Sequence, residues 1–466
     1  MVLQSWLRAF MAGTLMVDGH GLNGWPEILV FLSVVLSLGF FSFAYYRLWV
    51  NSALSIPDIK ALAFISIIIF SFMLPMLSND IFSYLVFGDA ANKGIDVYTN
   101  PQCTHFSTYF PYITNAWASS TCAYGSVTLW LAMTSALAGS GKILLALIAY
   151  KILILLFAFA FVEVASRVCV LMQSPARCLT FIVLNPVFLL QGVGQLHADL
   201  VAITFILAGI YFLLTNKWYL AFVMVALAIA TKMNYVLVLP FFIVALFIQE
   251  GIPATTLKKT GAGLMILLAT IVLVYAPFYT STATITTPFK FHFFQNPSKC
   301  IGEVLSYVVY YVPQLLSGHQ LQLSEAANNT SGPGTQVYIS NFIVKICQAF
   351  AVCASLYILI KFVFGKRAIN QWFRVYLRAL LLFLLYYMHI FNPWYLMMFL
   401  PFLWVIEEAA FIHWLLVLTC FISVQDVVCI VDRNSFVYIT ELALTFMSVM
   451  LYLYRPRYVF FTSLGY

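Results

Sequence analysis

Residues 58–84 read DIKALAFISIIIFSFMLPMLSNDIFSY, an apolar stretch that ends in a carboxylate. The part from 58 to 78 has about the length that a helix needs to cross a bilayer. Asp80 follows it after one residue. A bare carboxylate at the edge of a membrane is costly, so such residues usually serve a function. The stretch therefore predicts a membrane-spanning helix that delivers Asp80 to a functional site.

The composition extends this interpretation to the whole chain. Of the 466 residues, 63% are hydrophobic and 8% are charged, and a water-soluble domain could not bury so much apolar surface. We therefore expect an all-α polytopic membrane protein, with residues 1–466 forming a single integral membrane domain. The formal net charge of +7 comes from Lys and Arg in short loops, where such residues report orientation. No nucleic-acid partner is expected.

Apolar runs separated by short polar loops predict about thirteen transmembrane helices. Residues 124–139 are short for a span and are closed by Gly139-Ser140-Gly141, so they are predicted to form an interfacial or re-entrant helix. The two longest predicted loops are 79–123, which starts with a juxtamembrane helix, and 280–337. The predicted spans are 28–48, 59–78, 143–165, 178–193, 199–215, 218–231, 234–249, 261–279, 338–362, 376–391, 395–410, 411–430 and 436–454.

Basic residues set the predicted orientation. If loop 79–123 faces outside, the other loops place their Lys and Arg inside, as the positive-inside rule requires. Polar clusters from distant parts of the sequence then share the outer face. The inner basic residues are Arg167, Arg177, Lys217, Lys258, Lys259, Lys361, Arg378, Arg455 and Arg457, and the outer clusters are Asp80 and residues 195–199, 231–234 and 389–395.

These outer clusters suit the transfer of a sugar from a phosphate. Hydrolysis of a glycoside typically uses two carboxyl groups, whereas a phosphate leaves without protonation, so one base suffices. Asp80 is predicted to be that base. Lys232 is an unusual cation for an outer face and is predicted to bind the donor phosphate, assisted by His197 and His389. Simpler alternatives stay open: Lys232 could snorkel to the interface, Asp199 could cap its helix, and both histidines could be structural.

Loop 79–123 also bears on metals and disulfides. Asp89 and Asp96 lie far along the chain from Asp80, so no divalent-metal site and no cofactor are expected. Cys103 and Cys122 both fall in this loop. An oxidising compartment would allow a disulfide between them.

Several short elements follow one another between about residues 28 and 400. They are DIFSY at 80–84, DVY at 96–98, YGS at 124–126, NP at 185–186, GQLHAD at 194–199, Lys232, and NPWY at 392–395. In order and spacing they resemble the motifs of bacterial GT-C mannosyltransferases that use polyprenol phosphomannose. The resemblance implies a GT-C fold in the bacterial cytoplasmic membrane and an inverting transferase whose catalytic Asp lies in the first large external loop. It also implies a polyprenyl-phosphate sugar donor and a glycolipid or glycan acceptor.

The resemblance transfers roles to particular residues of this chain. Asp80 becomes the catalytic residue, and a hexose, by resemblance mannose, is expected to move to a lipid-linked or cell-envelope glycan. Val97, Ser126, Ala198 and Met233 depart from the residues usual in the family, which affects the donor sugar and acceptor more than the fold. The expected substrate-binding residues are Tyr84, Tyr98, His197, Asp199, Lys232, His389, Asn392 and Trp394, although 392–395 could also be a turn with interfacial aromatic anchors.

Two other classes of function stay open. A secondary transporter of a small polar or lipid-linked solute would carry charged groups near the middle of broken helices, within two symmetric halves. Neither pattern is visible in the sequence. A non-catalytic scaffold or lipid-binding subunit would use Asp80 and Lys232 only to pair with each other.

Overall fold

The computed structural model describes residues 54–75, 78, 80–113, 115–251, 254–293, 334–363, 368–386 and 393–405. Within these ranges the secondary structure is helical and includes no strand, as the apolar runs predict. The predicted spans 28–48, 411–430 and 436–454 lie outside the described residues.

The helices vary widely in length. Two of them, α7 (Ile143–Leu171) and α16 (Gly334–Val363), are 29 and 30 residues long. The others are α3 (Ile56–Ser71), α4 (Asp80–Asn92), α5 (Asn115–Ala118), α6 (Ser126–Gly139), α8 (Ala176–Val183), η3 (Phe188–Gly194), α9 (Asp199–Leu214), α10 (Trp218–Thr231), η4 (Met233–Val238), α11 (Leu239–Glu250), α12 (Ala254–Tyr275), α13 (Ala283–Phe293), α17 (Ile369–Tyr386) and η6 (Pro393–Val405), with short 3-10 turns at Cys103–Phe106, Phe110–Tyr112 and Ala276–Phe278.

The outward faces of the long helices are apolar. On α7, Tyr150 and Phe161 are buried, whereas Leu156 is 60% exposed. On α12, Leu273 is 73% exposed. A helix with apolar side chains on both its buried and its exposed face suits contact with protein on one side and lipid on the other. The exposed surface thus supports a membrane protein.

Three described segments are long and apolar enough to cross a membrane: Ile143–Leu171, Met233–Glu250 and Ala254–Phe278. A fourth is possible if α8 and η3, which differ in direction by 43°, count as one broken span. Shorter apolar helices include α6, α9 and α10. The described residues therefore support a helical membrane protein and leave the predicted count of about thirteen spans unconfirmed.

Several predicted spans have other boundaries in the structure. The span predicted at 59–78 is α3, which ends at Ser71, before Pro75. The span predicted as continuous at 178–193 is broken around Pro186, because proline cannot donate the helical hydrogen bond. The span predicted at 395–410 begins instead as the 3-10 helix η6. The predicted second loop, 280–337, contains α13.

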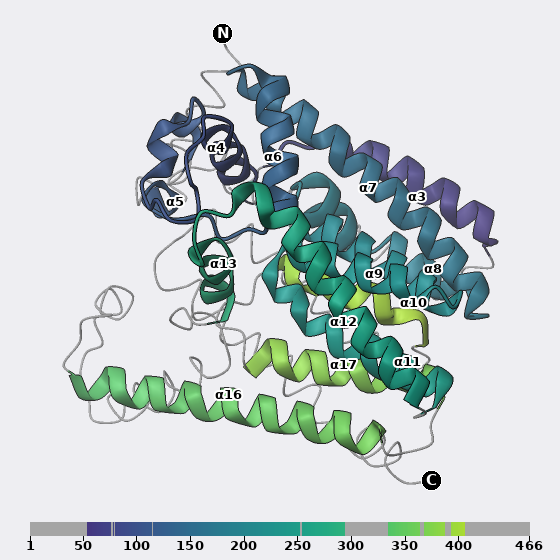
Figure 1. Cartoon of the computed structure of the whole chain (residues 1–466). Helices are drawn as coiled ribbons and strands as arrows, with labels where there is room; N and C mark the ends of the chain where they lie inside the picture. Colours follow the sequence, from purple (N-terminus) through teal and green to yellow (C-terminus); the bar gives the residue numbers. More distant parts are fainter. Residues whose placement is uncertain are drawn as a thin grey trace, which may run out of the picture.

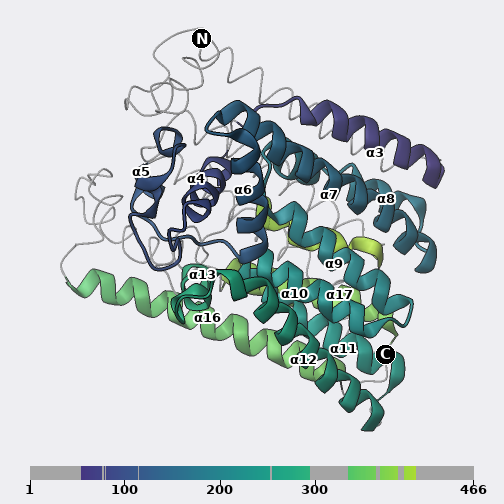
Figure 2. The ribbon, with the colours of Figure 1, turned by 45° about the horizontal axis from the view of Figure 1, so that its top comes forward.

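Figures 1 and 2 show how these helices are arranged. The pair α3 and α7 lies along one edge, α16 and α17 lie together along the opposite edge, and α9, α10 and α12 lie between them. α4, α5, α6 and α13 gather toward one end of the molecule. The two predicted outer loops therefore contribute to the same end.

Close contacts hold this end together. Gly88 of α4 packs so tightly on the backbone of Ala132 in α6 that a Cβ at position 88 would collide with it. Trp117 from the first loop stacks on Phe291 of α13, with ring centroids 5.7 Å apart. α4 begins the first loop as a helix, as predicted for a juxtamembrane segment.

Cys103 and Cys122 do not form the disulfide that the loop would allow. Both are buried free thiols. The Cys122 N–H donates to the carbonyl oxygen of Val97 at 2.8 Å, and Cys103 Sγ lies 4.0 Å from the same atom. Burial raises the pKa of Cys103 to about 12, so its thiol stays protonated and unreactive at neutral pH.

Candidate active site

Asp80 is the first residue of α4. Its backbone N–H donates to Ser78 Oγ at 3.2 Å, and its carbonyl oxygen accepts from Ser83 Oγ at 2.7 Å. The N-terminal end of a helix favours a negative charge. The side chain is 13% exposed, so the carboxylate lies mostly within protein yet remains reachable.

The surroundings of Asp80 change its acidity. Burial raises the pKa of Asp80 to about 6. The positive charge of Lys232 opposes this rise, the charge of Asp199 adds to it, and a hydrogen bond from Tyr124 opposes it. A carboxylate with a pKa near 6 is mostly ionised at pH 7 and is a stronger base than an ordinary Asp.

His197 reaches Asp80 from a distant part of the chain. After η3 the chain turns at Leu196, whose φ is +63°, a conformation that leucine rarely adopts. Strained turns of this kind collect at functional sites. His197 Nδ1 then lies 3.6 Å from Asp80 Oδ2, close but longer than a hydrogen bond. Burial, assisted by the charge of Lys232, holds the pKa of His197 well below its usual value, so the imidazole is neutral at pH 7.

Lys232 and Asp199 form a buried ion pair. Lys232 Nζ lies 2.8 Å from Asp199 Oδ2, and the two side chains are 3% and 0% exposed. The Tyr235 hydroxyl donates to Asp199 Oδ1 at 3.1 Å, and the Tyr395 ring centroid lies 4.6 Å from Nζ. A lysine this deeply buried does not fit the snorkelling alternative. Asp199 pairs with Lys232 and accepts a hydrogen bond from Tyr235, so its contacts go beyond capping helix α9.

A break between α10 and η4 positions Lys232, whose backbone is extended at φ −153° and ψ 124°. The carbonyl oxygen of Thr231 accepts from the Gly125 N–H at 3.1 Å and from Thr128 Oγ1 at 2.7 Å. Gly125 lies so close to the backbone of Ala230 that a Cβ would collide with it. The YGS element at 124–126 therefore holds the turn that carries the lysine.

Tyrosines surround the acidic groups. The Tyr84 ring meets Tyr124 edge to face at 4.5 Å and lies 5.8 Å from Tyr150. Among the described residues, the buried hydroxyls of Tyr84 and Tyr150 have no hydrogen-bond partner. Because buried hydroxyls are normally paired, these two are suited to bind a substrate hydroxyl.

The structure brings four predicted site residues together from separate segments: Asp80, His197, Asp199 and Lys232. Tyr84, also predicted, packs against Tyr124, which donates a hydrogen bond to Asp80. Tyr98 contacts the same segment, because its hydroxyl donates to the carbonyl oxygen of Tyr124 at 3.2 Å. Of the remaining predictions, His389 and Asn392 lie outside the described residues, as does the side chain of Trp394.

Sequence reasoning missed two tyrosines. Tyr235 could have been found, because it follows Lys232 by three residues and lies in the same polar element. Tyr150 lies inside the apolar run of α7, where a tyrosine carries no particular signal. Its position beside Tyr84 emerges only when α7 packs on α9.

Asp89 and Asp96 differ from Asp80 in their surroundings, which lower their pKa values instead of raising them. Burial opposes the ionisation of Asp89, but hydrogen bonds from Lys93, Thr108 and Ser107 outweigh it and lower its pKa. Burial likewise opposes ionisation of Asp96, and hydrogen bonds led by Thr280 lower its pKa. These acids hold the loops in shape. Across the described ranges, no group of three or more His, Cys, Asp and Glu side chains is placed to hold a metal ion.

The fold and the cluster together indicate a helical membrane protein in which buried ionisable side chains meet at the ends of several helices. Over residues 2–248, more than half of the chain, it matches the family described as "Alpha-(1->6)-mannopyranosyltransferase, N-terminal domain". The chain belongs to this family, in agreement with the resemblance drawn from its motifs.

Two relatives come from Corynebacterium glutamicum. Alpha-(1->6)-mannopyranosyltransferase A is 25% identical over 176 residues, which are 37% of this chain and 35% of that protein. Alpha-(1->6)-mannopyranosyltransferase B is 28% identical over 145 residues, which are 29% of this chain and 23% of that protein. The similarity thus spans about a third or less of each relative's length.

Proposed function

We propose that this protein is an inverting membrane glycosyltransferase that moves a hexose, most simply mannose, from a polyprenyl-phosphate donor to a lipid-linked or cell-envelope glycan. The observation that carries the proposal is the meeting of Asp80, His197 and the Asp199–Lys232 pair at one end of the helices. Family membership and the two mannosyltransferase relatives support the choice of mannose.

Asp80 is the base in this proposal. The acceptor hydroxyl attacks the anomeric carbon of the donor from the face opposite the phosphate, and Asp80 takes up the hydroxyl proton as the bond forms. Its pKa of about 6 suits a group that is ionised at pH 7 and gains a proton during the reaction. Neutral His197 lies 3.6 Å away, too far to hold the carboxylate in a hydrogen bond, so the carboxylate stays available to the acceptor.

Lys232 is the proposed partner of the donor phosphate. Negative charge grows on the phosphate as the glycosidic bond breaks, and a cation at low dielectric stabilises that charge. Asp199 holds Nζ at 2.8 Å and so orients the ammonium group before the donor arrives. The Tyr395 ring beside Nζ adds a cation–π contact that also helps to hold the ammonium group in place.

The active site is proposed to face outside, where lipid-phosphate sugars can be presented in the membrane plane. Single cysteines on a cysteine-free background, probed with an impermeant thiol reagent in intact cells, test this orientation. Positions 105 and 217 are suitable, because both are exposed, whereas 197 and 232 are buried. Labelling at 105 alone supports the proposal. Labelling at 217 alone places the site on the cytosolic side and favours a nucleotide-sugar donor.

A secondary transporter is the alternative that one observation favours. The 43° bend between α8 and η3 is the kind of broken helix on which transporter sites are built, and it leads directly to His197. A transporter would move solute without forming a glycosidic bond. Formation of product in detergent, where no compartments exist, separates the two functions.

The direct test uses purified protein, a radiolabelled polyprenyl-phosphate mannose, and a glycolipid extract as acceptor. We expect labelled glycolipid to form with the wild-type protein and not with Asp80→Asn. Label transfer from a nucleotide sugar instead of the lipid phosphate would overturn the proposed donor. Absence of transfer from either donor, together with solute uptake into proteoliposomes, would support the transporter.

A further inference from the structure

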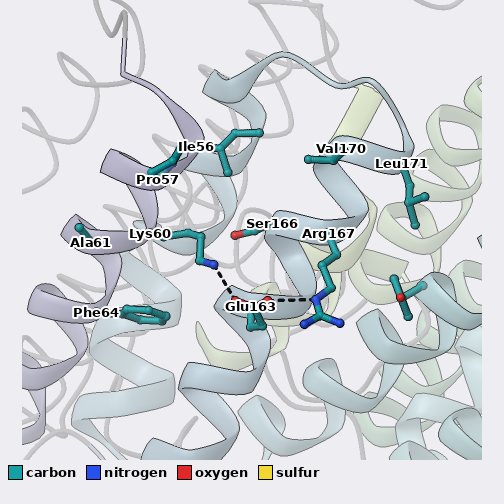
Figure 3. Close-up of a pocket in the computed structure, with 11 residues that line it drawn as sticks. Ile56, Pro57, Lys60, Ala61, Phe64, Glu163, Ser166, Arg167, Val170 and Leu171 are labelled. Atoms are coloured by element: carbon teal, nitrogen blue, oxygen red, sulfur yellow. Dashed lines mark hydrogen bonds and ion pairs between the residues drawn. The ribbon is translucent and has the colours of Figure 1, made fainter.

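A groove lies at the end of the helices away from Asp80. It has a volume of about 680 Å³ and runs between the N-terminal half of α3 and the C-terminal end of α7 (Figure 3). Asp80 follows the C-terminal end of α3. On α7, Glu163 of the groove lies 13 residues after Tyr150, which packs against Tyr84 beside the candidate site, so about 20 Å of helix at 1.5 Å per residue separates the two places. The groove is therefore a separate site.

Three charged side chains cross the groove. Lys60 Nζ lies 2.6 Å from Glu163 Oε2, and Arg167 Nε lies 2.9 Å from Glu163 Oε1, as Figure 3 shows. Two cations thus share one carboxylate, which leaves one unit of positive charge. This count covers the side chains that line the groove; Asp58, whose carboxylate accepts a hydrogen bond from Ser55 Oγ, is not one of them.

The walls of the groove are apolar. Pro57, Ala61 and Phe64 form one face of α3, three to four residues apart, and Val170 and Leu171 form the opposite wall on α7. Val170 is 61% exposed. The same α3 face continues to Ile68, which is 50% exposed. An exposed apolar strip that leads away from a charged cluster matches the two parts of a phospholipid, its chains and its head group.

We propose that this groove binds an anionic phospholipid, with the phosphodiester beside Lys60 and Arg167 and an acyl chain along Phe64 and Ile68. Charge complementarity favours an anionic lipid over a zwitterionic one, because the surplus positive charge repels an ammonium-bearing head group. The guanidinium presents a planar fork of donors that fits a phosphate. Glu163 holds both cations in place and competes with the lipid for them.

The site is independent of the proposed transfer reaction and can be tested without it. Purified full-length protein is titrated with phosphatidylglycerol or phosphatidylcholine, and bound lipid is measured by native mass spectrometry. We expect clear preference for phosphatidylglycerol. Lys60→Ala and Arg167→Ala should each weaken that binding about fivefold, and Glu163→Gln should strengthen it by a similar factor.

Lys259→Ala is the matched control. It removes another partly exposed lysine from an ion pair, in this case with Glu250 at 2.7 Å, and should leave lipid binding unchanged. The gain expected from Glu163→Gln keeps the test decisive if an alanine variant folds poorly. Equal binding of both lipids, or equal losses in Lys259→Ala and Arg167→Ala, would overturn the proposal. So would unchanged binding in all groove variants, which would mean that lipid binds elsewhere or that another part of the chain fills the groove.

Discussion

Two kinds of carboxylate occur in the first predicted outer loop. Burial raises the pKa of Asp80 to about 6, whereas hydrogen bonds overcome burial and lower the pKa of Asp89 and Asp96. The two loop acids are paired with donors that stabilise their negative charge. Asp80 is held where ionisation is costly, as expected of a group that must accept a proton. The difference in pKa is the reason that we assign the proposed base role to Asp80 and a structural role to Asp89 and Asp96.

The largest effect should come from Asp80→Asn. The amide keeps the shape of the side chain but cannot accept the proton of the acceptor, so we expect turnover to fall by at least about 100-fold. Radiolabelled mannose transfer measures the loss, and elution from a sizing column confirms that the variant is folded.

Asp89→Asn and Asp96→Asn are the matched changes at the paired acids. They should reduce transfer far less, because they act only through the shape of the loop. If either proved more damaging than Asp80→Asn, the site would be centred further into the loop and the comparison would be wrong.

The second-largest effect on activity is expected for changes at Lys232 and Asp199, the most deeply buried charges of the candidate site. Breaking a buried ion pair leaves one uncompensated charge and costs about 3–5 kcal/mol. We therefore expect both Lys232→Ala and Asp199→Asn to lower the free energy of unfolding and the activity. Lys232→Ala should raise the donor KM and lower kcat, with little change in the acceptor KM. Lys232→Arg should be partly active.

The double variant Lys232→Met/Asp199→Leu separates a structural from a catalytic role. Removing both charges restores apolar packing, so stability should largely return. Activity should not return, because the donor phosphate has lost its cation. Recovery of transfer in the double variant would show that the pair only supports the fold.

The two kinds of carboxylate should also respond to pH with opposite sign. The folded pKa of Asp80, about 6, lies above its ordinary value of 3.8, so its contribution to stability is fully present below about pH 4 and is lost as pH rises through 6. Asp80→Asn should then be more stable than the wild type at pH 7, by up to about 3 kcal/mol, and the gain should vanish below about pH 4.

Asp96 should behave in the opposite way. Its pKa is lowered in the folded protein, so its contribution is present above its ordinary pKa and is lost as pH falls. Asp96→Asn should therefore destabilise the protein at pH 7. Thermal unfolding of both variants at pH 4 and pH 7 measures the signs. A loss of stability in Asp80→Asn at pH 7 would mean that its carboxylate is paired after all.

The sequence predicted the helical class and singled out polar residues that the structure brings together, because a polar side chain in an apolar chain stands out wherever it occurs. Asp80, His197 and Lys232 were each found in this way. It did not predict that Lys232 pairs with Asp199, since residues 33 positions apart meet only through packing of α9 on α10. The bend at Pro186 was also missed, because the apolar run on either side of the proline reads as one span.

The smallest expected effect extends the comparison of paired and poorly paired groups from carboxylates to two buried tyrosine hydroxyls. The Tyr150 hydroxyl is buried without a hydrogen-bond partner among the described residues, so Tyr150→Phe should not lower stability. If that hydroxyl binds substrate, its loss should reduce kcat/KM by about fivefold, the worth of one hydrogen bond.

Tyr109→Phe is the matched control, since the Tyr109 hydroxyl donates to the carbonyl oxygen of Ala136 at 3.1 Å and accepts from the Gly141 N–H at 3.2 Å. It should cost about 1 kcal/mol of stability and leave kcat/KM unchanged. Reversed results, with Tyr150→Phe less stable and fully active, would place Tyr150 in the packing of α7 and remove it from the site.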